Sequence, residues 1–370
     1  MENELRVIIS GGGTGGHIFP AVSIANAIRE LVPDAKILFV GAEGRMEMQR
    51  VPAAGYEIKG LPIRGLYRPL WKLANIGVAI DYLKSKWMAR KIIREFRPQV
   101  AVGVGGYASS ATLGAAYDLH IPCLVQEQNS YAGLTNKRLA QKAEKFCVAY
   151  EGMERLFPAD KIMLTGNPVR QSLLDAKTTR EEALALFRLD PNKKTVLLVG
   201  GSLGARTINE SVLQHLSDIA ESGIQFIWQT GKYYSEQIAE ELKQKGKPEC
   251  LVVTDFISDM AAAYKAADLV LSRSGAGSIS EFCLLGKPVI LVPSPNVAED
   301  HQTKNAMALV NRQAALYVKD SEAPDKLILL AIETVRDEEK LASLSQNILK
   351  MALPNSAEII AKEVIKLTKK

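Results

Sequence analysis

The stretch Ser10-Gly11-Gly12-Gly13-Thr14-Gly15-Gly16-His17 follows an apolar run at residues 5–9 and precedes a helical pattern that begins near Pro20. Glycine allows a sharp turn and lets a ligand approach the main chain. The start of the following helix offers unpaired N–H groups and a partial positive charge, which favour an anion. The stretch therefore predicts a phosphate-binding turn with a titratable histidine at its edge.

The rest of the chain alternates apolar strand patterns with helical patterns. A second glycine turn, Gly200-Gly201-Ser202-Leu203-Gly204, closes the first strand of the second half in the same way. Apolar strands joined by helices predict parallel sheets covered on both faces. For 370 residues, we expect an α/β protein of two doubly wound domains, 1–166 and 167–354, with both turns facing a common cleft. A closing helix, Ser356–Leu367, could pack on either domain. The other predicted strands are 36–40, 56–61, 99–104, 122–126, 145–149, 161–165, 195–199, 225–229, 250–254, 269–272 and 288–292.

Composition predicts a soluble protein, with 47% hydrophobic and 24% charged residues. The four cysteines form no CxxC pair, which indicates buried reduced thiols without a metal site. The N-terminus lacks a signal-peptide pattern, and no apolar run reaches the ~18 residues of a membrane span.

The first turn also fits two other interpretations. Gly11-x-Gly13-x-x-Gly16 matches the dinucleotide fingerprint, which requires an acidic residue at the end of the second strand. Here that strand ends in Val40-Gly41-Ala42, and Glu43 is the nearest acid. Glycines that serve tight packing alone are the second interpretation.

The second turn matches the nucleophile elbow Gly-x-Ser-x-Gly, for which Asp268 and His301 could complete a triad. We favour a phosphate cradle made by helix N–H groups and the Ser202 hydroxyl, supported by Arg206.

A third small-residue turn, 272–281, ends in Glu281, which could accept both ribose hydroxyls or cap its helix. Side chains of the cluster Asp300-His301-Gln302-Thr303 should reach the same strand ends. The chain contains no Asp-x-Asp, HExxH or Walker lysine, so we expect no metal cofactor. A transferase would then stabilise a diphosphate leaving group with N–H groups, dipoles and Arg170.

One segment carries the basic excess. From Arg64 to Arg97 there are nine Lys or Arg residues and two acids, a balance of +7 in a chain of net charge +5. Residues 70–96 predict a helix whose apolar stripe, by default, packs in the core. The basic residues, with Tyr67, Trp71 and Trp87, instead suggest docking on an anionic membrane surface. Nucleic acid is not expected, because no nucleic-acid-binding motif accompanies the segment.

Together the motifs resemble the MurG family, the bacterial transferases that add N-acetylglucosamine to lipid-linked muramyl-pentapeptide. The motifs, in the family's order, are Gly12-Gly13-Thr14-Gly15-Gly16-His17, Gly105-Gly106-Tyr107, Glu127-Gln128-Asn129, Gly166-Asn167-Pro168-Val169-Arg170, Gly200-Gly201-Ser202-Leu203-Gly204-Ala205-Arg206, Arg273-Ser274-Gly275-Ala276 and His301-Gln302-Thr303-Lys304-Asn305.

The resemblance implies a GT-B fold of two Rossmann-like domains facing a central cleft, with residues 355–370 packing back on the first domain. It implies UDP-N-acetylglucosamine as donor and undecaprenyl-diphospho-muramyl-pentapeptide (lipid I) as acceptor, in peptidoglycan synthesis. It places the protein peripherally on the cytoplasmic face of the bacterial inner membrane, where other cell-wall synthesis proteins could be partners.

The resemblance also implies roles for individual residues. The acceptor would contact Gly13, His17, Gly105, Gly106 and Tyr107. The donor would contact Thr14, Gly15, Gly16, Asn129, Arg170, Ser202, Ile257 through its backbone, Ala276, Gly277, Ser278, Glu281 at the ribose, and Gln302. Family members often have a histidine where this chain has Gln126, so a base role there does not transfer.

The implied reaction is a single inverting displacement in which the C4 hydroxyl of the acceptor attacks the anomeric carbon. His17 is the candidate catalytic base, because histidine titrates near neutral pH, or it only binds the acceptor diphosphate. Another GT-B enzyme such as a UDP-N-acetylglucosamine 2-epimerase, a dinucleotide oxidoreductase and a non-catalytic membrane scaffold are the alternatives.

Overall fold

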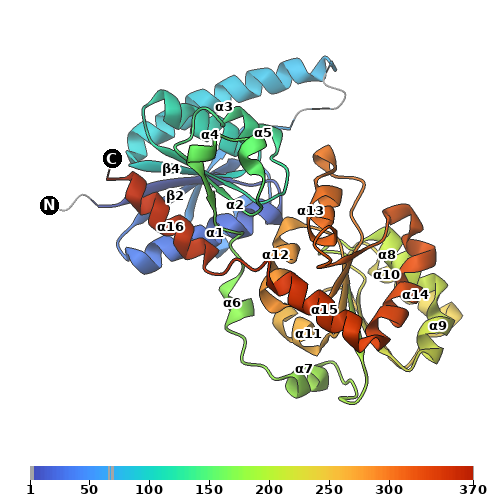
Figure 1. Ribbon diagram of the computed structural model, residues 1–370. Coiled ribbons are helices and arrows are strands. Elements are labelled where there is room, and N and C mark those ends of the chain that lie inside the picture. The colour runs from blue at the N-terminus through green and yellow to red at the C-terminus, as the bar shows by residue number, and fades with distance from the viewer. Residues whose placement is uncertain (1–3, 66, 68–70, 370) are drawn as a thin grey trace. The chain divides into compact units, whose positions relative to one another are not determined.

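The computed structural model describes residues 4–65, 67 and 71–369. It divides into unit 1, Met1–Arg170 with Leu353–Lys370, and unit 2, Gln171–Ala352 (Figure 1). Each unit contains one parallel sheet with helices on its faces. The predicted α/β class with two parallel-sheet domains is confirmed, whereas a common cleft stays a prediction.

The sheet of unit 1 has seven strands in the order β3-β2-β1-β4-β5-β6-β7. Its central strands are buried on both faces, as their unbroken apolar sequences predict. The strands are β1 (Arg6–Gly11), β2 (Lys36–Ala42), β3 (Glu57–Leu61), β4 (Val100–Gly105), β5 (Cys123–Glu127), β6 (Lys145–Val148) and β7 (Ile162–Leu164).

Helices cover both faces of this sheet. They are α1 (Gly15–Leu31), α2 (Glu47–Ala53), α3 (Ala74–Phe96), α4 (Tyr107–Asp118), α5 (Leu134–Arg138) and α16 (Ser356–Leu367). Short 3-10 turns lie at Met153–Arg155 and Ala159–Lys161. α16 lies beside α1, and its Ile360 and Val364 share one core with Ile24 and Ile28 (Figure 1).

α1 begins five residues before the predicted start. Glycine disfavours helices, so the sequence assigns Gly15 and Gly16 to the turn. In the structure the N–H groups of His17 and Ile18 both donate to the Thr14 carbonyl oxygen, which closes the first turn earlier.

α3 corrects the default interpretation of its apolar stripe. Its buried residues are Val78, Ser85, Ala89 and Ile93, whereas the predicted stripe faces outward. The side chains of that stripe are each between 61% and 82% exposed: Leu73, Ile76, Ile80, Leu83 and Trp87. Trp71, which precedes the helix, is 85% exposed. Arg68 and Leu70 of the predicted segment lie outside the described residues.

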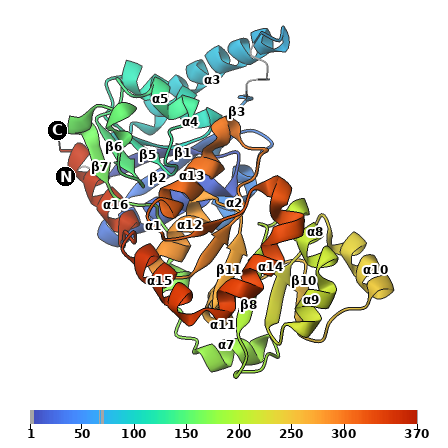
Figure 2. The same cartoon turned by 45° about the vertical axis from the view of Figure 1, so that its right-hand side comes forward.

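The sheet of unit 2 has six strands in the order β10-β9-β8-β11-β12-β13 (Figure 2). They are β8 (Thr195–Val199), β9 (Gln225–Gln229), β10 (Leu251–Thr254), β11 (Leu269–Ser272), β12 (Val289–Leu291) and β13 (Leu316–Tyr317). β13 was not predicted, because two residues are too short for a strand pattern. The helices are α6 (Gln171–Leu174), α7 (Arg180–Leu186), α8 (Arg206–Gln214), α9 (Leu216–Glu221), α10 (Ser235–Lys245), α11 (Met260–Ala266), α12 (Ala276–Leu285), α13 (His301–Val310), α14 (Ala323–Arg336) and α15 (Glu338–Leu349). Short 3-10 turns lie at Ala298–Asp300 and Asp320–Glu322.

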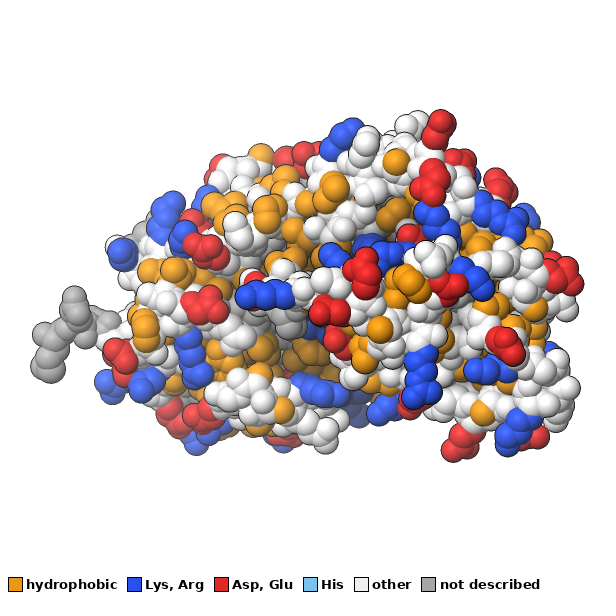
Figure 3. Space-filling view, turned by 90° about the horizontal axis from the view of Figure 1, so that it is seen from below, with side chains coloured by type: hydrophobic (Ala, Val, Ile, Leu, Met, Phe, Trp, Pro, Cys, Tyr) orange, Lys and Arg blue, Asp and Glu red, His pale blue; other side chains and the backbone are white. Residues whose placement is uncertain are grey.

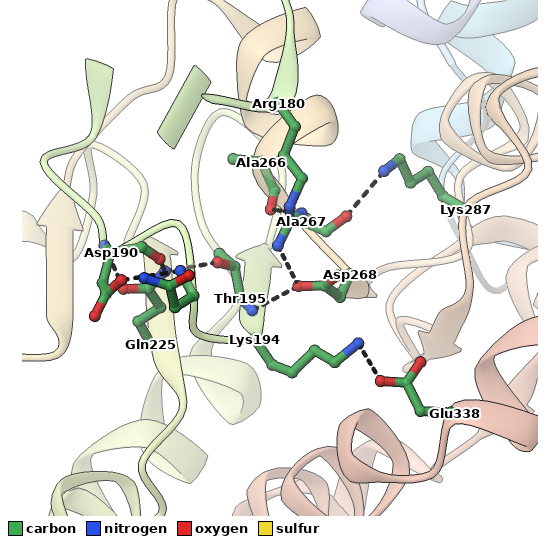
Figure 4. Close-up of polar contacts among 11 residues, drawn as sticks. Arg180, Asp190, Lys194, Thr195, Gln225, Ala266, Ala267, Asp268, Lys287 and Glu338 are labelled. Atoms are coloured by element: carbon green, nitrogen blue, oxygen red, sulfur yellow. Dashed lines mark hydrogen bonds and ion pairs between the residues drawn. The ribbon is translucent and has the colours of Figure 1, made fainter. Parts of the chain in front are cut away.

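A cluster of polar side chains lies at the N-terminal ends of the strands of the second sheet (Figure 4). Asp268 Oδ2 accepts hydrogen bonds from the Thr195 N–H at 2.8 Å and from Arg180 Nη2 at 2.9 Å. Lys287 Nζ donates to the Ala267 carbonyl oxygen at 2.8 Å. Burial lowers the pKa of Lys287 to about 8. This cluster lies at the beginning of the strands, away from the edge at which ligands of such sheets bind.

Candidate functional site

Each sheet has a switch point, where successive connections leave in opposite directions. It lies between β1 and β4 in unit 1 and between β8 and β11 in unit 2. Ligands of open parallel sheets bind beyond the carboxyl ends of the strands at such points. The loops there are 11–14 and 105–106 in unit 1, and 200–205 and 273–275 in unit 2. The predicted phosphate turns therefore lie where each sheet is expected to bind a ligand.

In unit 1, His17 packs against the turn after β4. Its Nδ1 lies 2.9 Å from the Gly12 carbonyl oxygen. A Cβ on Gly105 would lie 2.8 Å from Nε2 of the ring, and one on Gly106 would lie 2.5 Å from the Gly12 oxygen. Both glycines also have positive φ, 100° and 87°. Close approach and backbone conformation thus both require glycine there.

The contact with Gly12 fixes the tautomer of His17. A carbonyl oxygen only accepts hydrogen bonds, so Nδ1 carries the proton when the ring is neutral. The lone pair of the neutral ring is therefore on Nε2, next to Gly105. A neutral imidazole with this lone pair can accept a proton near neutral pH.

Glu47 lies beneath the first glycine loop and is fully buried. Its carboxylate accepts hydrogen bonds from the N–H groups of Gly13 at 2.9 Å and Ala42 at 3.0 Å. A Cβ on Gly12 would lie 2.1 Å from Oε1, and one on Gly41 2.6 Å from Cγ. The Gly13 N–H therefore already donates to a carboxylate of this chain and is not directed at a ligand phosphate. This argues against the dinucleotide-phosphate interpretation. Any contact of Gly13 with an acceptor would use its other atoms.

The Glu127-Gln128-Asn129 motif at the end of β5 is held by a second buried carboxylate. Glu127 accepts from the Asn129 N–H at 3.0 Å, from Asn129 Nδ2 at 3.2 Å and from Asn136 Nδ2 at 2.8 Å. Burial raises the pKa of the Glu127 carboxyl, although these donors oppose the rise. The contacts fix Asn129, the predicted donor ligand, at the carboxyl end of β5.

Gln126, at the position where the family often has histidine, belongs to a buried amide network. Its Nε2 donates to Asn167 Oδ1 at 2.8 Å, and its Oε1 accepts from Gln128 Nε2. Gln128 Nε2 also donates to the Val104 carbonyl oxygen at 2.8 Å. A glutamine amide takes up no proton near neutral pH, so Gln126 links strand ends instead of acting as a base.

The remaining predicted residues of unit 1 border the first loop or the turn after β4. The guanidinium of Arg170 lies 5.9 Å from the centre of the Phe19 ring in α1, and that ring packs against Gly15. Tyr107, the first residue of α4, is 51% exposed. Thr14 and Gly16 are also exposed.

In unit 2, the turn 200–205 packs backbone to backbone on the loop after β9. A Cβ on Gly204 would lie 2.1 Å from the Thr230 carbonyl oxygen, and one on Gly231 the same distance from the Gly204 nitrogen. Ser202 is exposed before α8, and Ala205, the N-cap of α8, supplies no side-chain hydrogen bond. A hydroxyl beside uncapped helix N–H groups can bind a phosphate.

Ala276, Gly277 and Ser278 form the first turn of α12, as the third small-residue turn predicts. The N-cap, Gly275, has no side chain to satisfy their N–H groups. The buried Ser274 hydroxyl donates to the Gln302 carbonyl oxygen at 2.8 Å, which joins this turn to the start of α13. The Gln302 side chain in turn accepts from the Ser294 N–H at 2.9 Å.

Glu281 lies one turn further along α12, so it does not cap the helix. Its Oε2 accepts a hydrogen bond from the buried hydroxyl of Tyr264 at 2.9 Å. Ile257 follows the edge strand β10 and buries its side chain, which leaves contacts with a ligand to its backbone. The predicted donor residues of unit 2 thus all follow carboxyl ends of one sheet.

The nucleophile-elbow alternative is wrong. Asp268 binds the first residue of β8, whereas Ser202 follows the last residue of that strand. Five strand residues span roughly 16 Å. Ser202 and Asp268 therefore cannot belong to one triad.

Sequence reasoning assigned no role to Glu47 and Tyr264. The expected acid of the first domain was sought at the end of β2, where Glu43 is exposed, but Glu47 enters the loop from α2. Tyr264 gave no signal, because a buried tyrosine in a helix is ordinary core. Within the described ranges, no group of three or more His, Cys, Asp or Glu side chains could hold a metal ion.

Two family models match most of the chain. The glycosyltransferase family 28 N-terminal domain matches residues 7–148, and the family 28 C-terminal domain matches residues 195–361. Two parallel-sheet domains with glycine turns at their switch points, together with these matches, define a glycosyltransferase of the GT-B fold.

A protein of Bacteroides thetaiotaomicron is 68% identical over 369 residues, and the match covers 99% of each chain. Its name is UDP-N-acetylglucosamine--N-acetylmuramyl-(pentapeptide) pyrophosphoryl-undecaprenol N-acetylglucosamine transferase. The solved structure of Acinetobacter baumannii MurG is 27% identical, with a TM-score of 0.79 over 98% of this chain and 99% of that one. The chain belongs to the MurG family, which confirms the resemblance.

A UDP-GlcNAc 2-epimerase from Neisseria meningitidis, solved bound to UDP-GlcNAc, has a TM-score of 0.67 over 98% of this chain and 100% of that one. At 16% sequence identity this similarity shows a common fold alone, so the epimerase alternative is not favoured.

Proposed function

We propose that the protein transfers N-acetylglucosamine from UDP-N-acetylglucosamine to the C4 hydroxyl of muramyl-pentapeptide on undecaprenyl diphosphate, with inversion at the anomeric carbon. The observation that carries this proposal is the 68% identity, over nearly the whole chain, to a transferase of that printed name. The product would be lipid II, a precursor of peptidoglycan.

In this proposal unit 2 binds the donor. The Ser202 hydroxyl and the first N–H groups of α8 and α12 hold the diphosphate, Glu281 the ribose and the Ile257 backbone the uracil. These groups stabilise the charge that develops on UDP as it leaves, and no metal ion is required. The family resemblance assigns further donor contacts to each unit. In unit 2 they are residues 276–278 and Gln302, and in unit 1 they are residues 14–16, Asn129 and Arg170.

Unit 1 receives the acceptor at the loops 12–17 and 105–107. His17 Nε2 takes the proton of the C4 hydroxyl as oxygen attacks the anomeric carbon from the face opposite UDP. The orientation of the ring supports this role, because Nδ1 is held by Gly12 and the lone pair is on Nε2. Binding of the acceptor diphosphate by His17 is the competing role.

Transfer of radiolabel from UDP-N-acetylglucosamine to a short-chain lipid I analogue, with and without EDTA, tests the reaction. We expect equal transfer in both conditions. Loss of transfer with EDTA would contradict the metal-free proposal, and formation of the 2-epimer without transfer would replace the whole function.

His17→Ala separates the two roles of the histidine, with the exposed His120→Ala as control. If His17 is the base, kcat at saturating acceptor falls by roughly 100-fold or more. Near wild-type kcat with a raised KM for the acceptor would leave only the binding role.

We further propose that α3 docks unit 1 on an anionic membrane, at the cytoplasmic face of the inner membrane. Its exposed apolar stripe is beside a pocket of about 660 Å³ lined by Arg6, Trp87, Arg90, Lys91, Arg94, Glu95 and Arg97. On the face seen from below in Figure 3, by contrast, basic and acidic side chains are interspersed. No described helix is both long and apolar enough to span a bilayer. The proposed docking is peripheral, through the exposed apolar stripe of α3. Contacts with other cell-wall synthesis proteins stay an expectation.

Vesicle sedimentation with anionic lipid tests the docking. Lys86 and Arg90 pair with Asp118, so Lys84 and Arg94, which are exposed, are the sharper basic positions to change. We expect the double change Lys84→Gln with Arg94→Gln to weaken binding roughly 30-fold, because each of the two basic residues contributes about 1 kcal/mol. Leu83→Glu should also weaken binding, because it removes apolar area from the stripe and adds a negative charge. Leu186→Glu, equally exposed but in unit 2, is the matched control. Unchanged binding of the α3 variants would overturn the assignment.

A further inference from the structure

The peptide group between Gly12 and Gly13 is bound at both ends by side chains. Its N–H donates to Glu47 Oε2 at 2.9 Å, and its carbonyl oxygen accepts from His17 Nδ1 at 2.9 Å. The second oxygen of Glu47 accepts from the Ala42 N–H at the end of β2. A buried carboxylate, one peptide group and an imidazole thus form a continuous hydrogen-bonded row.

We propose that Glu47 is a positioning residue, which acts through this peptide group to fix the orientation and tautomer of His17. A carboxylate bound to the N–H end polarises the peptide and makes its carbonyl oxygen a stronger acceptor. The stronger acceptor holds the proton on Nδ1 and leaves the lone pair on Nε2. The aspartate of a catalytic triad orients its histidine by the same logic, but directly and without an intervening peptide.

The surroundings of Glu47 show that the loop is built around its carboxylate. Side chains are excluded at Gly12 and Gly41, where a Cβ would lie 2.1 Å and 2.6 Å from Glu47 atoms. Both carboxylate oxygens receive a backbone N–H, the pairing that an ionised, fully buried carboxylate requires.

Glu47→Gln tests the proposal, because it keeps the shape of the side chain but places an NH2 group against one of two N–H donors. Glu43→Gln, which changes an exposed carboxylate in the turn before α2, is the matched control. The first readout is the ¹⁵N spectrum of the His17 ring above its pKa, which distinguishes Nδ1–H from Nε2–H; the chain has four histidines, and His17→Ala assigns the signal. The second readout is kcat and KM for UDP-N-acetylglucosamine, with the melting temperature and UDP binding as measures of folding.

We expect Glu47→Gln to lose the Nδ1–H preference of His17. We also expect kcat to fall roughly 10- to 100-fold, because a misoriented base loses part of the roughly 10²–10⁴-fold that a positioned base contributes, with KM for the donor near the wild-type value. If the tautomer of His17 is unchanged in Glu47→Gln, the proposal is overturned, whatever happens to kcat. A lower kcat with an unchanged tautomer would mean that Glu47 only maintains the shape of the loop. The proposal rests on the proposed function only for its effect on kcat. A wild-type protein that transfers no sugar would refute that function, while the tautomer readout would still decide the role of Glu47.

Discussion

Tyr264 illustrates how one buried hydroxyl can act on a ligand that it does not touch. Its hydroxyl donates to Oε2 of Glu281, the carboxylate that the proposed function assigns to the ribose. Phe282, next to Glu281, packs edge-on against the Tyr264 ring, with 5.7 Å between the ring centres. The position of the Tyr264 hydroxyl is therefore fixed by the packing of its ring on Phe282 as well as by the backbone of α11.

We predict that Tyr264→Phe weakens UDP binding by roughly tenfold, because a hydrogen bond to a charged group contributes about 1.5–3 kcal/mol and part of it holds Glu281 in place. Binding of 2′,3′-dideoxy-UDP, which lacks the hydroxyls, should not change. Calorimetric titration of both nucleotides checks this, with Tyr317→Phe as control. Equal weakening for both nucleotides would mean a general structural role.

Single residues could be predicted where a sequence motif places them, but not where their position depends on contacts between segments that are distant in the sequence. Spacing after strands located the turn at Gly105 and Gly106 and the start of α12, whereas the roles of these residues and of His17 stay predictions. Glu47 was not, because the acid that serves the first loop comes from α2, and only the folded loop brings the two together. The role of Gln126 likewise depends on Asn167, 41 residues away.

At the scale of elements, periodicity predicts that a helix has an apolar face but not what covers that face. α3 was therefore predicted as a helix, while its stripe fitted both core packing, the default interpretation, and docking on a membrane; the structure excludes the first, because the stripe is exposed. Local propensity also misplaced the start of α1, since a bond to Thr14 outweighs the glycines there. The strands were predicted well, because burial on both faces leaves continuous apolar runs.

The loop before β12 carries an element-scale prediction about pH. Lys287 has a pKa lowered by burial to about 8, against 10.5 ordinarily. Between these values the unfolded chain keeps a proton that the folded chain has released, so the free energy of unfolding rises with pH. Below pH 8 both states are protonated, and the full cost of burying the charge applies. The rise amounts to at most about 3 kcal/mol.

Lys287→Met should remove this rise, so the stability difference between the two proteins changes between pH 8 and 10. Urea unfolding can be followed by the buried Trp228 of β9, in a background with Trp71 and Trp87 replaced by phenylalanine. Curves that stay parallel from pH 7 to pH 10 would contradict the assignment.

At the scale of the whole molecule, two tandem parallel sheets could be predicted from strand order and glycine turns. The residues alone did not give the route of the chain, because α16 has an apolar face that suits either sheet, and only the family resemblance implied that it returns to the first domain. In the structure this face completes the core of unit 1, although 182 residues of unit 2 precede it.

We predict that Ile360→Ala destabilises unit 1 by about 2–5 kcal/mol, the usual cost of such a cavity, and leaves unit 2 unaffected. Hydrogen exchange should accelerate in α1 and β1 but not in β8 or β9. Its neighbour Ile359 is 38% exposed, and Ile359→Ala should change little. Faster exchange in both units would show that their stabilities are coupled.

The late position of α16 also sets the order in which the protein can mature on the ribosome. Unit 2 is one continuous segment and can fold as soon as it has emerged, whereas unit 1 waits for its last helix. At about 5–20 residues per second, the 182 intervening residues take roughly 10–40 s to synthesise. During that interval the side chains of α1 that pack on α16 stay exposed, although others already pack on β1 and β4, so we expect nascent unit 1 to be a client for a chaperone.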